Sequence, residues 1–230
     1  MNPGATRALA GEFLGSALLT AVVIGSGIAA QSLSPGDTGL QLLENAFATA
    51  LGLGVLILLF QTVSGAHFNP VVSLVDAVLH RKGWAITAAY LPAQIFGCIA
   101  GAILANLMFA EPAIAWSTTA RATWPHLLAE VVATAGLVLV IFALVRTGRG
   151  HLAAPAVGAY IGAAYFFTSS TSFANPAITI GRAFSDTFAG IAPASVLPFI
   201  AAQLIGGALG WALVRAFFPA PNSATAPAKG

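Results

Sequence analysis

Charged residues are scarce in this chain. Lys, Arg, Asp and Glu together make up 7% of its 230 residues, whereas 58% of the residues are hydrophobic. An ordinary soluble domain carries about 25% charged residues, and a chain with so few cannot cover a soluble fold with polar surface. The composition therefore predicts an integral membrane protein in contact with the lipid bilayer. A net charge of +2 is also too small to indicate a nucleic-acid-binding protein.

Cysteine is nearly absent as well. The single cysteine, Cys98, excludes an internal disulfide bond, and its place inside an apolar run favours a role as a small packing residue. Three of the four histidines, namely His80, His126 and His151, fall at predicted helix ends and lack the spacing of metal ligands. The chain also lacks a paired Ser and His, two facing Asp residues and a His-rich motif, so we expect no enzyme, no cofactor and no metal site.

Long apolar runs are abundant, in contrast. A helix needs about 20 residues to cross a bilayer, and six runs approach or exceed that length. The first run is too long for the apolar region of a cleaved signal peptide and carries a glutamate, so it also predicts a crossing. The six predicted crossings are Ala8–Ala30, Leu40–Val63, Trp84–Phe109, His126–Val145, Leu152–Ser170 and Ala194–Phe218.

The basic residues predict how these crossings are oriented. The two termini and the loops after the second and fourth crossings share one side of the membrane and hold most of the Lys and Arg. Because cytoplasmic segments carry an excess of these residues, we expect both termini to be cytoplasmic. The predicted cytoplasmic residues are Arg7, Arg81, Lys82, Arg146, Arg149, Arg215 and Lys229, and the two on the opposite side are Arg121 and Arg182.

Two related tripeptides each open an apolar stretch that is too short to cross a bilayer. They are Asn69-Pro70-Val71 and Asn175-Pro176-Ala177. An Asn side chain caps the free amides of a helix start, and a Pro at the first helical position has no amide to satisfy, so each tripeptide predicts the beginning of a short helix. Inside a membrane, such a start must be sheltered by a pore or by protein.

Further matched residues indicate an internal duplication. Each half of the chain reads as helix, helix, re-entrant Asn-Pro segment and helix. Three crossings per half is an odd number, so the second half must be inverted relative to the first. Matching glycines four residues apart favour close helix packing. The matched residues are Ala93–Gly97 with Gly101, which repeat at one constant offset as Ala202–Gly206 with Gly210, and Glu12, which corresponds to Glu130.

This duplication predicts a single domain over residues 1–218. Its two repeats cover about residues 7–110 and 124–218, and we expect the Pro/Ala/Ser-rich tail at residues 219–230 to be disordered. The inversion brings the two half-helix N-termini together near the middle of the membrane, where their positive dipole ends disfavour a cation. The Asn amide hydrogens remain available to a neutral oxygen. We therefore expect a path for neutral hydroxylated solutes that rejects protons and metal ions.

These features resemble the aquaporin and glycerol-facilitator (major intrinsic protein) family. The resemblance rests on the stretch from Ser64 to Val71, on the second Asn-Pro-Ala tripeptide and on the matched Gln/Gly segments, and it covers roughly Arg7 to Phe218. It implies an all-α membrane protein with an aquaporin-like fold of six tilted transmembrane helices and two re-entrant half-helices. It also implies a homotetramer with one pore per subunit that passes water and small neutral solutes. Val71 in place of Ala in the first motif is a conservative change.

The segment from Asn175 to Ile191 is further similar to bacterial members associated with arsenic detoxification. That similarity implies a bacterial inner (plasma) membrane protein and adds arsenite and methylated arsenicals to glycerol and water as candidate solutes. Trihydroxy arsenic is neutral near neutral pH and resembles a small polyol.

The outer constriction departs from the family pattern. Family members usually carry an arginine directly after the second tripeptide, where this chain has Ile178, and glycerol facilitators place an Asp next, where this chain has Thr179. Losing a guanidinium removes bulk, charge and hydrogen-bond donors, so we expect a wider selectivity filter that admits larger neutral solutes. By counting from the two motifs, the remaining filter positions are Thr49, with Leu51 as an alternative, Phe166 or Ser169, and Ser172.

Arg182 leaves two interpretations open. It lies one turn beyond Ile178 and could line the outer mouth of the pore as a displaced charge. It also lies four residues before Asp186, a spacing at which the two side chains would pair along a helix.

Two glutamates fall inside predicted crossings, near the side from which each re-entrant segment enters. We expect Glu12 and Glu130 to accept hydrogen bonds from unpaired loop amides, and Glu12 to accept one from His67 as well. This loop-supporting role is favoured over a proton relay, which is the other use of an intramembrane carboxylate.

Two other functions remain alternatives to a channel with a wide filter. One is a water-selective aquaporin. The other is an ion-coupled secondary transporter, because inverted repeats with broken helices also build that class. Ion coupling would need a carboxylate beside the half-helix starts, and the sequence places none there.

Overall fold

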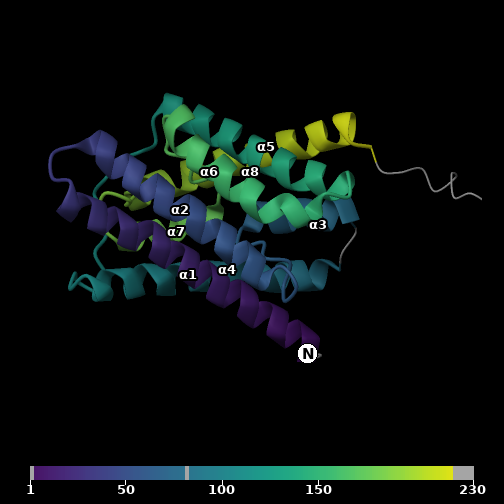
Figure 1. The fold of residues 1–230 in the computed structure, drawn as a ribbon, viewed down its shortest axis with the longest axis horizontal. Helices are drawn as coiled ribbons and strands as arrows, with labels where there is room; N and C mark the ends of the chain where they lie inside the picture. The colour runs from purple at the N-terminus through teal and green to yellow at the C-terminus, as the bar shows by residue number, and fades with distance from the viewer. Residues whose placement is uncertain (1–2, 81–82, 220–230) are drawn as a thin grey trace, which may run out of the picture.

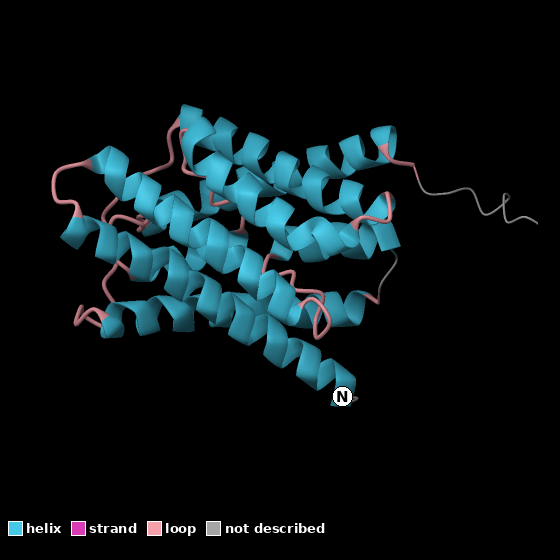
Figure 2. Ribbon diagram, in the orientation of Figure 1, coloured by secondary structure: helices cyan, strands magenta, loops and turns pink. Residues whose placement is uncertain are grey.

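The computed structural model describes residues 3–80 and 83–219. Arg81, Lys82 and Lys229 lie outside the described residues, as does the tail predicted over 219–230 except for its first residue. Every regular element within the described residues is helical (Figure 2). In chain order the elements are α1 (Pro3–Leu33), α2 (Thr38–Phe60), α3 (Pro70–His80), α4 (Trp84–Met108), α5 (Trp124–Arg146), η1 (Gly150–Leu152), α6 (Ala153–Phe167), α7 (Pro176–Gly181), η2 (Arg182–Phe184) and α8 (Pro193–Phe217).

Six of these helices correspond to the six predicted crossings. Five of them, α1, α2, α4, α5 and α8, are long and apolar enough to cross a membrane by length and composition. The sixth, α6, has only 15 residues and ends at Phe167, three residues before the predicted end. It ends early because Thr168 adopts an extended backbone, with φ −113° and ψ 135°, and so begins the second re-entrant loop.

Figure 1 shows how the two halves are arranged. The start of α1 and the end of α8 lie at the same end of the molecule, on the right of the view, and we call this the N-terminal end. The described basic residues of the predicted cytoplasmic set, Arg7, Arg146, Arg149 and Arg215, belong to the helix ends and turns on that side. The short helices α3 and α7 lie between the long ones, and each packs against both α4 and α8.

The helix pairs of the two halves match. Helix α1 packs against α4, and α5 packs against α8. A Cβ atom added to Gly101 would lie 2.0 Å from the carbonyl oxygen of Ala17, and one added to Gly210 would lie 2.7 Å from that of Ala135. Only a glycine permits so close an approach of two backbones, and van der Waals packing is what holds helices together in lipid. The matched glycines therefore lie where their spacing predicted, at the helix crossings.

Candidate functional site

Each Asn side chain caps the half-helix that follows it. The Asn69 Oδ1 atom accepts a hydrogen bond from the backbone N–H of Val71 at 2.9 Å. The Asn175 Oδ1 atom accepts from the N–H groups of Ala177 at 3.0 Å and Ile178 at 3.3 Å. These bonds satisfy amides that a helix start leaves free.

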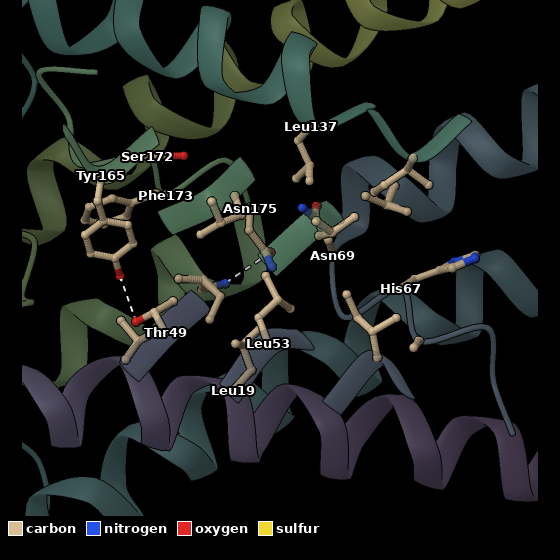
Figure 3. A pocket seen from close by; sticks show the side chains of 18 of the residues that line it. Leu19, Thr49, Leu53, His67, Asn69, Leu137, Tyr165, Ser172, Phe173 and Asn175 are labelled. Carbon is tan, nitrogen blue, oxygen red and sulfur yellow. Dashed lines mark hydrogen bonds between the residues drawn. The ribbon is translucent and has the colours of Figure 1, made fainter. Parts of the chain in front are cut away.

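The same two side chains tie the half-helices to each other. The Asn69 Nδ2 atom donates to the carbonyl oxygen of Ala174 at 2.7 Å, and the Asn175 Nδ2 atom donates to that of Phe68 at 2.7 Å. Both asparagines line one cavity, and Figure 3 shows them close together in its middle. Each amide nitrogen carries two hydrogens, so one hydrogen of each remains available to a solute after the reciprocal bonds are made.

The loops before the two asparagines share an unusual backbone. Ala66 and Phe68 have positive φ angles of 52° and 49°, and the matching Ser172 and Ala174 have φ angles of 51° and 48°. Each such residue costs about 1–2 kcal/mol when it is not glycine, so the conformation persists only where other contacts fix it.

Glu12 supplies such contacts for the first loop. This carboxylate is fully buried. Its Oε1 atom accepts from the Ser64 hydroxyl at 2.6 Å and the His67 backbone N–H at 3.0 Å. Its Oε2 atom accepts from the Phe68 N–H and from the Gln94 Nε2 group, both at 2.7 Å. His67 therefore reaches Glu12 through its backbone amide.

Glu130 has the matching environment in the second half and is also fully buried. Its Oε1 atom accepts from the Ser170 hydroxyl at 2.6 Å and the Phe173 N–H at 2.9 Å. Its Oε2 atom accepts from the Ala174 N–H at 2.8 Å and the Gln203 Nε2 group at 2.7 Å. All four positions correspond to those around Glu12, so the loop support obeys the inverted repeat.

The two glutamines are functional residues that sequence reasoning treated only as a repeat signal. Besides its glutamate, Gln94 donates to the Ser73 hydroxyl at 2.9 Å, and Gln203 donates to the Thr179 hydroxyl at 2.8 Å. Each hydroxyl lies four residues after its Asn, on the half-helix itself. The glutamines therefore link each supporting carboxylate to the half-helix that it supports.

The ring of His67 lies where the cavity opens toward the N-terminal end. Its Nδ1 atom is 3.0 Å from the Ser73 hydroxyl, and its Nε2 atom is 3.9 Å from the Asp76 carboxylate. His67 lines both the narrow cavity, whose volume is about 70 Å³, and a wider vestibule of about 470 Å³. It therefore marks the junction between the vestibule and the narrow path.

The walls of the narrow cavity differ in chemistry. The two asparagines are its polar groups in the middle, and apolar side chains such as Leu19, Leu53 and Leu137 lie around them (Figure 3). Among the described residues that line this cavity, none is an Asp or a Glu. A solute in the middle of the path thus meets a few fixed donors and otherwise hydrocarbon.

A cluster of larger and more polar side chains lines the cavity beyond the asparagines. Thr49, Ser172 and Ile178 all lie there, as predicted by counting from the motifs. The Thr49 hydroxyl is 3.2 Å from the hydroxyl of Tyr165 (Figure 3). Leu51, the alternative to Thr49, is 56% exposed on the outer surface.

The prediction for the fifth crossing needs a correction. Phe166 is 54% exposed on the outer surface, and the exposed Ser169 donates through its hydroxyl to the carbonyl oxygen of Pro125. Neither residue lines the cavity, whereas Tyr165 does. Successive residues of a helix point about 100° apart, so the inward direction of Tyr165 turns Phe166 away. The sequence offered only a partial signal: a buried Tyr usually needs a polar partner, but this helix holds two tyrosines, Tyr160 and Tyr165.

Arg182 lies inside the cavity and does not pair with Asp186. It is only 2% exposed, its Cζ atom lies 3.4 Å from the ring centroid of Phe173, and its Nε group donates to the carbonyl oxygen of Ala189. Asp186 is exposed and accepts from the N–H of Thr118 at 2.8 Å. Helix α7 ends at Gly181 and the chain is extended at Ser185, so the i,i+4 geometry needed for the predicted pair is not formed.

A second arginine approaches the same ring from the segment between α4 and α5. The Arg121 Cζ atom lies 5.3 Å from the Phe173 centroid. Its Nε group donates to the carbonyl oxygen of Gly190 at 2.7 Å, and its Nη2 group donates to that of Phe188 at 3.0 Å. Burial lowers the pKa of Arg121 from its ordinary value, yet an arginine stays protonated throughout the physiological range.

Comparisons with known proteins show which family model and which relatives the chain matches. Residues 2–174 match the family model described as major intrinsic protein. The chain is 46% identical over 211 residues to the aquaglyceroporin AqpS of Rhizobium meliloti (strain 1021), and the alignment covers 91% of this chain and 89% of that protein. It is 33% identical to the probable aquaporin TIP3-2 of Oryza sativa subsp. japonica, covering 82% and 72% of the two chains.

A solved structure gives the same result for the fold. The X-ray structure of the aquaglyceroporin from Plasmodium falciparum superposes with a TM-score of 0.72 and covers 91% of this chain and 95% of that chain. At 21% sequence identity the likeness concerns the fold alone. It confirms the predicted arrangement of six helices and two half-helices with an inverted repeat.

Proposed function

The chain belongs to the major intrinsic protein family, and from that membership we propose that it passes glycerol and trivalent arsenicals as well as water. Membership makes it a multi-pass membrane channel for water and small solutes and not an enzyme. The solute range is our proposal. The 46% identical relative is named an aquaglyceroporin, which supports the inclusion of glycerol.

The proposal rests mainly on the position of Ile178. It follows the second Asn-Pro-Ala tripeptide, it lines the narrow cavity, and it is 4% exposed. An arginine at this position would add a fixed charge and five N–H donors to this part of the path. With isoleucine there, a solute meets an apolar surface on this side and the hydroxyls of Thr49 and Tyr165 nearby.

The size and charge of the proposed solutes fit these walls. Arsenite as the neutral trihydroxy species presents three hydroxyls on a compact centre, much as glycerol does. Such a molecule exchanges hydrogen bonds with the Asn69 and Asn175 amides and turns its other side to hydrocarbon. The lack of a carboxylate among the described lining residues supports passive flow over ion-coupled transport.

One observation favours a water-selective aquaporin as a second candidate function. Arg182 and Tyr165 both line the cavity beyond the asparagines. A guanidinium stacked on Phe173 occupies space one turn from Ile178 and narrows the path that the isoleucine widens. The two candidates therefore differ in which side chain sets the minimum radius.

Flux measurements on proteoliposomes separate the two candidates. We expect the native channel to pass water, glycerol and arsenite. In the Ile178→Arg variant, the flux of glycerol and arsenite should fall about tenfold or more, and the water flux should fall less. Ile178→Val is the matched control, because it keeps an apolar side chain at the site. Equal loss for all three solutes, or no loss, would show that Ile178 does not set the constriction. A native channel that passes water alone would favour the second candidate.

Assembly and orientation complete the proposal. We propose a homotetramer in the plasma membrane of a bacterium, with the N-terminal end facing the cytoplasm. The cluster of Arg7, Arg146, Arg149 and Arg215 at that end supports the orientation, because positive charge is retained on the cytoplasmic side. Accessibility of a single introduced cysteine at each end of α8, measured in intact cells, tests it.

A further inference from the structure

Two arginines, the buried Arg182 and the partly buried Arg121, converge on one aromatic ring at the end of the cavity that is farther from His67. The Cζ atoms of Arg182 and Arg121 lie 3.4 Å and 5.3 Å from the centroid of Phe173. Two points so close to one centroid are within about 9 Å of each other, a distance at which like charges repel in a weakly solvated site. The arginines come from different parts of the chain, so the fold itself brings the two charges together.

Within the described part of the chain neither arginine forms a direct ion pair with a carboxylate, and the buried Glu130 acts on both only as a charge at longer range. The Asp76 carboxylate lies 3.9 Å from the Nε2 atom of His67, on the other side of the asparagines. Glu130 is occupied by the loop amides and Gln203, as described above. Asp186 is exposed and bound to Thr118. A buried charge normally needs a partner of opposite sign, and these two arginines take only carbonyl oxygens and the face of a ring.

Arg182 also keeps donors that no described residue accepts. Its Nε group is bound to Ala189, and the stacked guanidinium presents its two Nη groups without a protein acceptor. The side chain is 2% exposed and lines the cavity, so its guanidinium borders the path and is shielded from bulk solvent. A planar fork of N–H groups of this kind matches two oxygens of one small oxyanion.

We propose that this end of the cavity is a binding site for a small monovalent oxyanion of the size of nitrate. Arg182 donates to the anion, and Arg121 supplies a second positive charge nearby. The site coincides with the constriction next to Ile178, so a bound anion and a neutral solute exclude each other. The channel thus carries an anion-dependent brake on neutral flux.

Nitrate tests the site on the native protein in two ways. In proteoliposomes, glycerol flux is measured with potassium nitrate or potassium gluconate at equal concentration on both sides, and gluconate serves as the bulkier reference anion. With nitrate at about ten times its dissociation constant, glycerol flux falls about tenfold. In detergent, nitrate raises the midpoint of thermal unfolding relative to gluconate. The flux measurement rests on the proposed channel function, whereas the unfolding measurement does not. Failure of the anion site can therefore be distinguished from failure of the proposed function.

Variants then assign the effect to the arginines. Arg182→Gln removes the charge and the fork, and both nitrate effects disappear. Arg182→Lys keeps the charge without the fork and leaves a weaker effect. Arg215→Gln is the matched control, because Arg215 also lies over an aromatic ring, that of Trp211, but at the N-terminal end. If Arg182→Gln does not fold, Arg121→Gln takes its place and weakens nitrate binding. Equal flux and equal unfolding midpoints in nitrate and gluconate for the native protein would overturn the proposal.

Discussion

The buried carboxylate of Glu130 offers a direct test of how the second re-entrant loop is held. Its two oxygens accept hydrogen bonds from two loop amides, one serine hydroxyl and Gln203. The substitution Glu130→Gln keeps the volume of the side chain but replaces one oxygen with an NH₂ group. Whichever oxygen is lost, two of the four donors lose their acceptor and face another donor.

The magnitude follows from the number of donors left without an acceptor. A buried donor without a partner costs about 1–3 kcal/mol, so two of them cost about 2–6 kcal/mol. This is a large share of the about 5–15 kcal/mol by which typical proteins are stable. We also expect a loss of flux. Ser172 and Ala174 adopt a strained, positive-φ backbone, and the hydrogen bonds to Glu130 keep the loop in that conformation.

The assay is thermal unfolding of the detergent-solubilised variant, followed by circular dichroism, together with water flux in proteoliposomes. Glu111→Gln is the matched control, because Glu111 is exposed and its substitution should change neither readout. Glu12→Gln should be destabilised to the same degree as Glu130→Gln, since the two carboxylates have corresponding partners. A Glu130→Gln protein that unfolds at the temperature of the Glu111→Gln control would refute this reasoning.

Three further predictions concern the midplane, the constriction and the helix crossings. Asn175→Asp places a negative charge between the half-helix starts, so we expect proteoliposomes with this variant to leak potassium, unlike those with the native protein. An unchanged ion conductance would contradict the dipole argument. Tyr165→Phe removes the hydroxyl that faces Thr49 and should change the ratio of glycerol to water flux, whereas Phe166→Leu on the outer surface should leave the ratio as it is. Gly101→Ala places a Cβ atom 2.0 Å from a carbonyl oxygen and should lower the free energy of unfolding by about 1–3 kcal/mol. Gly83→Ala is the control, because a Cβ atom there meets open space. Equal unfolding midpoints for the two variants would count against the packing described.

The features that sequence predicts well are those with a local physical cause. Asn followed by Pro favours a helix start, and α3 and α7 do begin at Pro70 and Pro176. A glutamate inside an apolar run must find donors, so Glu12 and Glu130 were recognisable as loop supports. The six crossings follow from the length of apolar runs, but several ends were misplaced: α1 runs from Pro3 to Leu33, beyond both predicted ends, and α2 and α6 each end three residues early.

The features that sequence does not predict depend on backbone geometry between the motifs. Counting residues back from Asn175 assumes a regular path, but Thr171, Ser172 and Ala174 have positive φ angles, which alter the direction in which each side chain points. A count across such a loop does not give the register of helix α6, in which Tyr165 lines the path and Phe166 turns away. Arg182 is a similar case. Helix α7 ends just before it, so the four-residue spacing to Asp186 does not bring the two side chains together.

The central claim is that the path past Asn69 and Asn175 passes neutral hydroxylated solutes and rejects cations. Stopped-flow measurement on one preparation of proteoliposomes tests it most directly, with light scattering for glycerol and an entrapped pH dye for protons under a potassium diffusion potential. The account predicts glycerol flux well above that of empty liposomes and a proton flux equal to theirs. Glycerol flux at the level of empty liposomes, or a proton leak that rises with the amount of protein, would contradict it.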